Sequence, residues 1–499
     1  MNKLILSAFL ISTHFCSDAQ PFIDSFDIAP GKTNSIPDVM YAHGRDLYFI
    51  ANDSIHGAEL WVKRPDSSPP TRLTDVMAGS ENSMTNYRKC IASLGNTVYF
   101  AAKDSINGAE LWSCTPQGNC QMVKDVYVGP EGSIPSNFLP HDGKLYFTAR
   151  HQTYIHELWS YDPSNGNATR LTSIGTSTIG SYIEETIVYN NKIYFRAGNA
   201  QSGIELYEYD PASGTTQMIA DINSGPASSI PGHFLVFDNK LYFNADEAAT
   251  GYELYVWDGT NLVTRLTDLR PGTGDGVNNR KFDQLNGKLY FVGYDAGSGF
   301  YQLMEYNPTN NNTAKVYTIA NGGQDPSIDY LTNYSGAIFF KARDANHGDE
   351  LWKYDGINNP SLIADIYPGT MHGSIYSLTD AWPNLYFRAR NESYGIELFR
   401  YSDFATGVEN VTRTENVKTY PNPTKDIAHL EINLEHNQAL EAIITDMNGR
   451  TVYKSGKVLY SAAKHTIDIP LQNLPAGNYV YSLQDVSGNL VATGKMVKQ

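Results

Sequence analysis

The sequence has no long hydrophobic run, no sustained helical periodicity, little cysteine and a shortage of basic residues. Its N-terminal apolar run, Leu4 to Ile11, is too short to cross a bilayer as a helix. Lys and Arg number 37 against 53 Asp and Glu, and the formal net charge of −16 argues against nucleic acid and anionic membrane surfaces as partners. Aromatic residues make up 12% of the 499 residues, which favours an ordered β protein.

Familiar catalytic signatures are missing as well. The chain contains no G-x-S-x-G nucleophile elbow, no HExxH zinc motif, no phosphate-binding loop and no EF-hand loop. These gaps favour a binding protein over an enzyme, although a dispersed set of acidic residues would carry no such signature. The sequence leaves the catalytic residues unknown and predicts no cofactor.

The N-terminus reads as a secretory signal peptide over residues 1–19. One Lys precedes the apolar run, and small and polar residues lead to a cleavage site near Ala19. A membrane anchor is the alternative, and the short run argues against it. Cys16 follows Thr-His-Phe rather than the small residues that precede a lipidated cysteine, so we do not expect a lipoprotein.

Three cysteines remain after the signal. Cys114 and Cys120 bracket the turn-rich stretch TPQGN, so a local disulfide is an option in an oxidising compartment. Cys90 would then be a buried free thiol. Three unpaired cysteines are the alternative.

The chain is built from an internal repeat. The stretches NDSIHGAELW (52–61) and KDSINGAELW (103–112) are the first of eight related copies, 47 to 51 residues apart, a period that fits one four-stranded propeller blade. We therefore expect an all-β fold, with an eight-bladed β-propeller over residues 20–408. We interpret the repeated Glu as a structural partner of backbone amides, at Glu59, Glu110, Glu157, Glu205, Glu253, Glu350 and Glu397, with Gln302 replacing it in the sixth copy.

The eighth copy lacks its outermost strand. After IELFRYS the chain runs into a polar stretch, whereas SFDIAPG (25–31) resembles the IADIYPG that ends at Gly369. The sequence thus predicts that the N-terminal segment supplies the outermost strand of the last blade and closes the ring.

The phrases ELYVWDGT (253–260) and ELWKYDGI (350–357) resemble the ELWxxDGT-repeat proteins. The resemblance covers residues 22 to 402 and implies little about function. Two blades depart from the pattern, because Ile155 replaces the turn Gly in the third and Gln302 replaces Glu in the sixth.

A linker over 409–417 precedes a second domain, 418–499, which reads as a small antiparallel β-sandwich with hairpin turns at Asn448-Gly449 and Ser487-Gly488. Its phrases YPNP, DMNGR and LPAGNY and its basic tail resemble the C-terminal sorting domain of the Bacteroidetes type IX secretion system. The resemblance implies Sec export, passage over the outer membrane by that machinery, and removal of the domain. Its sorting signal would include Pro421, Asn422, Pro423, Gly449, Gly477, Tyr479, Lys495 and Lys498.

Ligand-binding candidates are the residues that vary beside the turn Gly, because variable side chains on a fixed scaffold often carry recognition. They are His56, Asn107, Tyr154, His347 and Tyr394. Their polar and aromatic character suits sugars, although solvated turn residues would look the same. His141, His151 and His156 in the third blade match no metal-ligand spacing. Acidic residues on the same rim could bind calcium with backbone carbonyls, but turn capping is the simpler explanation for them.

From the sequence we expect a secreted or surface-attached monomer that binds a glycan or a protein through its propeller. A polysaccharide-degrading enzyme with its site in the central funnel and a structural adhesion component are the alternatives.

Overall fold

A computed structural model describes residues 22–402 and 417–499, apart from gaps at 66–67, 85–88, 116–117, 153–154, 176–180, 261, 320–321, 422–423, 435–437, 447–450, 462, 473 and 486–489. The chain divides into two compact units, Met1–Asp403 and Phe404–Gln499. The predicted signal peptide and residues 409–416 of the predicted linker lie outside the described residues. Within those residues no helix is long and apolar enough to cross a membrane.

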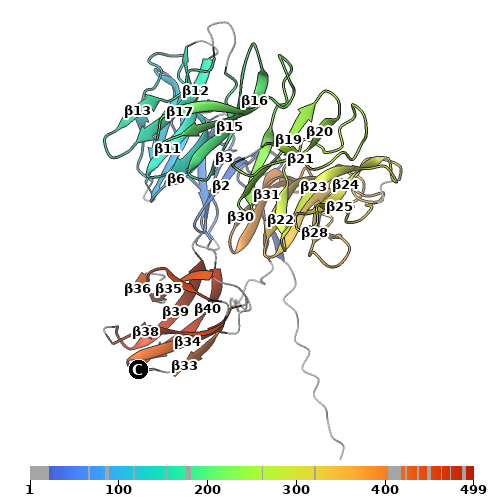
Figure 1. Cartoon of the computed structure of the whole chain (residues 1–499). Coiled ribbons are helices and arrows are strands. Elements are labelled where there is room, and N and C mark those ends of the chain that lie inside the picture. Colours follow the sequence, from blue (N-terminus) through green and yellow to red (C-terminus); the bar gives the residue numbers. More distant parts are fainter. Residues whose placement is uncertain are drawn as a thin grey trace, which may run out of the picture. The chain divides into compact units, whose positions relative to one another are not determined.

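The described part of the first unit consists of eight four-stranded antiparallel sheets (Figure 1). We number these sheets as blades 1 to 8. In blades 1 to 7 the chain runs from the inner strand outward, whereas the outermost strand of blade 8 is β1.

The strands of blades 1 to 4 are β2 (Asp38–His43), β3 (Asp46–Asn52), β4 (Ala58–Lys63) and β5 (Thr71–Arg72); β6 (Ile91–Leu94), β7 (Thr97–Asp104), β8 (Gly108–Cys114) and β9 (Cys120–Lys124); β10 (Ser136–His141), β11 (Lys144–Gln152), β12 (Ile155–Asp162) and β13 (Asn167–Arg170); and β14 (Glu184–Tyr189), β15 (Lys192–Asn199), β16 (Gly203–Asp210) and β17 (Thr215–Ala220). Those of blades 5 to 8 are β18 (Gly232–Phe237), β19 (Lys240–Glu247), β20 (Gly251–Trp257) and β21 (Thr264–Arg265); β22 (Asp283–Leu285), β23 (Lys288–Asp295), β24 (Phe300–Asn307) and β25 (Asn312–Lys315); β26 (Asp329–Tyr334), β27 (Ala337–Ala342), β28 (Glu350–Tyr354) and β29 (Ser361–Ala364); and β30 (Tyr376–Ala381), β31 (Asn384–Asn391), β32 (Gly395–Ser402) and β1 (Phe22–Phe26).

The second strand of most blades is apolar on both faces because it is covered by a blade on each side. In β3, for example, five consecutive residues from Leu47 to Ala51 are buried. Each hydrophobic cluster joins neighbouring blades, and Leu47 and Phe49 of blade 1 pack with Tyr386 and Leu398 of blade 8. The clusters thereby link all eight sheets into a closed ring, the arrangement of a β-propeller.

The predicted closure of the last blade by the N-terminal segment is confirmed. Strand β1 pairs antiparallel with β32, with Phe22 opposite Ser402 and Phe26 opposite Leu398. The pairing residues precede the Asp-Ile-Ala-Pro-Gly phrase by which the segment was recognised, just as β29 precedes the equivalent phrase in blade 7.

The cysteines of blade 2 differ in state. Cys114 and Cys120 form a disulfide between β8 and β9, whereas Cys90 is a free, fully buried thiol. Burial raises the pKa of the Cys90 thiol to about 12, so it stays protonated at neutral pH.

The second unit is a sandwich of two antiparallel sheets. One contains β33 (Lys418–Tyr420), β34 (Ile427–Asn433) and β38 (Lys464–Pro470), and the other β35 (Gln438–Asp446), β36 (Thr451–Lys454), β37 (Val458–Tyr460), β39 (Gly477–Asp485) and β40 (Leu490–Lys498). Alternate residues of β34, such as Leu430, pack against β35 and β39 residues such as Ile444 and Leu483 in one core. The two predicted hairpin turns, 448–449 and 487–488, lie outside the described residues.

Candidate functional site

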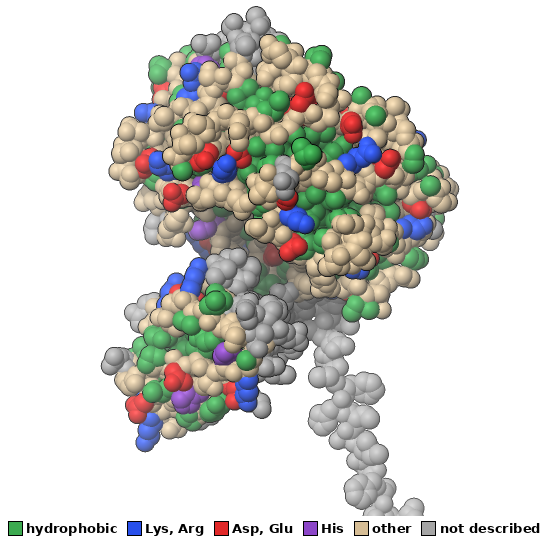
Figure 2. All heavy atoms as spheres, viewed as in Figure 1, with side chains coloured by type: hydrophobic (Ala, Val, Ile, Leu, Met, Phe, Trp, Pro, Cys, Tyr) green, Lys and Arg blue, Asp and Glu red, His purple; other side chains and the backbone are tan. Residues whose placement is uncertain are grey.

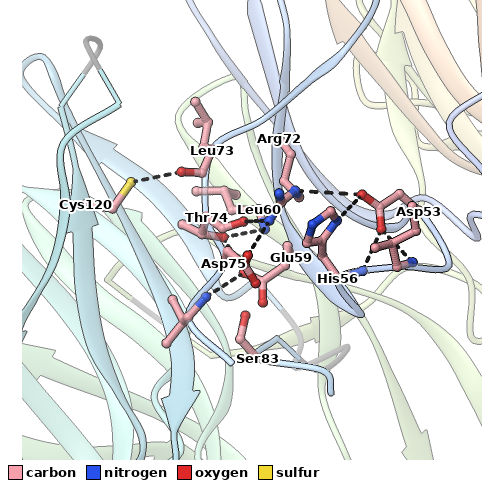
Figure 3. Close-up of polar contacts among 12 residues, drawn as sticks. Asp53, His56, Glu59, Leu60, Arg72, Leu73, Thr74, Asp75, Ser83 and Cys120 are labelled. Atoms are coloured by element: carbon pink, nitrogen blue, oxygen red, sulfur yellow. Dashed lines mark hydrogen bonds and ion pairs between the residues drawn. The ribbon is translucent and has the colours of Figure 1, made fainter. Parts of the chain in front are cut away.

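The repeated Glu side chains are buried, and both oxygens of most of them accept hydrogen bonds. Glu110 accepts from the amides of Val126, Tyr127 and Ser133 at 2.6–3.2 Å. In blade 1, Glu59 accepts from the Thr74 hydroxyl at 2.6 Å (Figure 3). Each side chain ties its third strand to the chain segment that leaves the blade, which is the structural role expected of it.

Burial sets the charge of these carboxyls. Desolvation outweighs the hydrogen bonds and raises the pKa of both Glu350 and Glu397 to about 7 and that of Glu253 to about 6. Gln302 makes one such bond, from the amide of Ile319 at 3.1 Å, without any charge.

The turn glycines are required by a close backbone approach as well as by their conformation. Gly57 has φ +68°, and a Cβ there would lie 2.2 Å from the carbonyl oxygen of Glu81 in the segment crossing to the next blade. Gly203 shows the same 2.2 Å approach to Ala227. A side chain at either position would collide with backbone, which explains why the residue recurs.

The turns of blades 3 and 6 differ locally from those of the other blades. In blade 3 the side chain of Ile155 lies 3.2 Å from where a Cβ of Gly175 would be, so Gly175 makes room for it. In blade 6, Asp295 pairs with Phe300, whereas in blade 2 Asp104 pairs with Gly108. The blade 6 turn is therefore one residue longer, and its Gly299 faces open space.

The rim candidates are engaged within their own turns. His56 Nδ1 bonds to Asp53 at 2.8 Å (Figure 3), and His347 bonds to Asp344 in the same way. Asn107 donates to Asp104 at 2.8 Å. Tyr394 is 40% exposed, and Tyr154 lies outside the described residues.

The acidic side chains of this rim that the structure describes cap their own turns. The hydrogen bonds from turn amides lower the pKa of Asp53, Asp104 and Asp344 although desolvation opposes them, as in turn-capping carboxylates. Across the described residues, no group of three or more His, Cys, Asp or Glu is placed to hold a metal ion. Desolvation lowers the pKa of His151 and of His156.

A different set of residues meets at the propeller axis. The inner strands begin there, and in six blades they carry a bulge whose second residue has positive φ. We call this set the axial site. Each second strand has a first Leu, Ile or Val, and nine positions before it stand Asp38, Lys89, Ser136, Glu184, Gly232, Arg280, Asp329 and Tyr376. The next positions hold Val39, Cys90, Asn137, Glu185, His233, Lys281, Tyr330 and Ser377.

Ion pairs connect different blades across this site. Lys89 of blade 2 lies 3.4 Å from Glu185 of blade 4. Desolvation alone would raise the pKa of Glu185, but Lys89, His233 and Arg196 together lower it. Desolvation also lowers the pKa of His233, which is therefore neutral at pH 7.

Blades 7, 8 and 1 add aromatic rings and a guanidinium. The rings of Tyr330 and Tyr376 are half-buried and pack edge to face with centroids 5.3 Å apart. Arg388 stacks 4.3 Å above Tyr376 and lies 3.4 Å from Asp38, to which Ser377 also donates at 2.9 Å. The Nε atom of Arg388 is buried and has no hydrogen-bond partner among the described residues.

The axial residues are not among the ligand-binding candidates predicted from the sequence, which all lie beside the turn Gly. A signal was available, since residues at a fixed offset before each second strand differ in charge from blade to blade. Elsewhere, on the face in Figure 2, acidic and basic side chains are interspersed over the propeller.

The molecule is a β-propeller followed by a β-sandwich. Residues 418–499 match the family described as the secretion system C-terminal sorting domain. Of the predicted signal residues, Pro421 precedes β34, Gly477 and Tyr479 lie in β39, and Lys495 and Lys498 lie in β40; Asn422, Pro423 and Gly449 lie outside the described residues. The domain marks the chain as a secreted, cell-surface protein.

Several solved structures are similar to this chain. A puromycin-hydrolysing peptidase from Mycobacterium tuberculosis is 9% identical with a TM-score of 0.46 over 82% of this chain, which spans only 58% of the peptidase. PorZ, a surface component of the type IX secretion system of Porphyromonas gingivalis, is 14% identical with a TM-score of 0.35 over 92% of this chain and 75% of PorZ. The propeller domain of the Trilobed protease from Pyrococcus furiosus is 11% identical with a TM-score of 0.37, and the match covers 69% of this chain and 98% of that domain. No curated protein matches the sequence.

Proposed function

We propose that the propeller binds a glycan at the axial site. The observation that carries this proposal is the buried Nε of Arg388, a donor without a partner among the described residues, beside the half-buried ring of Tyr376. A buried donor left unpaired is a place for a ligand or a water molecule. Aromatic rings next to fixed polar groups suit the apolar faces and hydroxyls of sugars.

The axis is favoured over the outer rim as the main contact. The polar ends of His56, Asn107 and His347 are already bonded inside their turns, so a ligand would have to displace these bonds. Tyr394 keeps an exposed ring and remains a candidate for a secondary contact.

Binding is favoured over hydrolysis. A glycosidase needs a carboxylic acid with a raised pKa as proton donor. Glu185 has a lowered pKa, and its axial neighbours Glu184 and Asp329 are each ion-paired with an Arg.

Calorimetric titration of the full chain with soluble polysaccharides, with calcium and with chelator, tests the proposal. We expect saturable binding without release of reducing sugar, and loss of that binding in Tyr376→Ala but not in the rim variant Tyr394→Ala. Binding that survives Tyr376→Ala would place the ligand elsewhere. Release of sugar would show that the protein is an enzyme. Absence of binding to every polysaccharide tested would point to a protein partner instead.

A further inference from the structure

The carboxylates of the axial site are already neutralised by neighbouring cations. Asp38 lies 3.4 Å from Arg388, and Glu185 lies 3.4 Å from Lys89. Asp329 lies 2.8 Å from Arg280. Glu184 is paired with Arg196. Each of these acids therefore has its own cation.

Lys281 is a further cation without such a partner. Its Nζ donates to the Thr332 hydroxyl at 3.3 Å, and no carboxylate of the described residues lies within ion-pair distance of it. Asp283 attracts Lys281 electrostatically, but its two oxygens accept the backbone amides of Gln284 and Asn333. Lys281 thus makes no ion pair among the described residues, although the charge of Asp283 acts on it.

Two lysines of the site belong to opposite sides of the ring. Lys89 belongs to blade 2 and Lys281 to blade 6, which are opposite blades in a ring of eight sheets. They are close enough for the charge of Lys89 to act on Lys281. Lys281 is exposed to solvent, and desolvation by the surrounding protein lowers its pKa. Both the mutual repulsion and the desolvation would be relieved by an anion.

We propose that Lys281 and Lys89 bind an anionic group of the ligand, a carboxylate or a sulfate ester, so that the preferred glycan is acidic. This inference rests on the proposed glycan binding at the same site. The charge of the whole chain, −16, would repel such a ligand at long range. A local pair of ammonium groups is therefore needed to hold it, because charge-assisted hydrogen bonds are stronger than neutral ones.

Pairs of polysaccharides that differ only in their charged group distinguish recognition of the acidic group from recognition of the sugar. Polygalacturonate is compared with its methyl ester, and dextran sulfate with dextran, by titration calorimetry on the full chain at two salt concentrations. Tighter binding of polygalacturonate than of its ester would assign a carboxylate, and tighter binding of dextran sulfate than of dextran a sulfate. We expect Lys281→Gln to weaken the preferred acidic member about tenfold or more and Lys281→Arg to retain most of the affinity.

Lys240→Gln is the matched control, since Lys240 begins β19, beyond the opposite end of the inner strand, and its loss changes the net charge equally. Thermal melts establish that each variant is folded. Equal binding of acidic and neutral members would overturn the acidic preference and leave glycan binding intact. Equal losses of affinity for the acidic polymer in Lys281→Gln and Lys240→Gln would refute the assignment to Lys281, because they would indicate non-specific electrostatic attraction. Absence of binding to all four polymers would count against the proposed function itself.

Discussion

Glu397 accepts a hydrogen bond at 3.0 Å from the backbone amide of Ile28, a residue that precedes it by 369 positions. Its other oxygen accepts the amide of Ser35 at 3.1 Å. The same side chain therefore anchors the N-terminal segment to the last blade twice, in addition to the pairing of β1 with β32.

Deleting residues 22–32 should open the ring. The deletion removes β1 and the buried side chains of Ile28 and Ala29, so β32 becomes an exposed edge. We expect the melting temperature to fall by about 5 °C or more, since each kcal/mol lost shifts a large domain by roughly 2 to 4 °C. A variant starting at Phe22 is the control, and equal melting of the two variants would contradict closure by β1.

Substituting the buried glutamates should change how stability depends on pH. The folded-state pKa of Glu350 and Glu397 is raised to about 7 from 4.5, so their contribution to stability is full below pH 4.5 and is lost as pH rises through 7. Gln does not titrate. The unfolding free energy of the double variant Glu350→Gln/Glu397→Gln, minus that of the natural chain, should therefore increase from pH 5 to pH 8.

Urea denaturation at several pH values measures this difference. Histidines titrate in the same window, but they are present in both proteins and largely cancel. A difference that stays flat with pH would show that these carboxyls are ionised throughout.

Gly57→Ala should cost more stability than Gly44→Ala. Both residues have positive φ, +68° and +61°, so the backbone strain is similar. Only at Gly57 would the new Cβ meet backbone, 2.2 Å from the Glu81 oxygen, while Gly44 faces open space. We expect roughly 1 to 2 kcal/mol for Gly44→Ala and clearly more for Gly57→Ala, measured by urea unfolding. Equal losses of unfolding free energy in the two variants would mean that the segment around Glu81 moves aside at little energetic cost.

Removing residues 418–499 should stop export at the periplasm. The sorting domain lies in a separate compact unit, so we expect the propeller to fold without it. Surface labelling and cell fractionation would detect the truncated protein inside the outer membrane. Its appearance at the cell surface would refute the sorting role.

Repetition decided what the sequence could predict. The blade strands, the buried Glu and the closing strand recur at a fixed period, so each copy supported the others. The axial site has no such support, because its residues differ at each copy. The neighbours of Lys89 and Lys281 come from other blades, and only the closed ring brings them together.

The order of synthesis gives the pairing of Phe22 with Ser402 a further meaning. Strand β1 is synthesised before the other described strands of the propeller, yet its partner β32 is synthesised after all of them. Until β32 is synthesised, β1 has no partner strand, and the face of blade 1 that packs against blade 8 stays uncovered. The ring can therefore close only after every blade has been synthesised, and a product truncated before β32 would leave β1 without its partner strand.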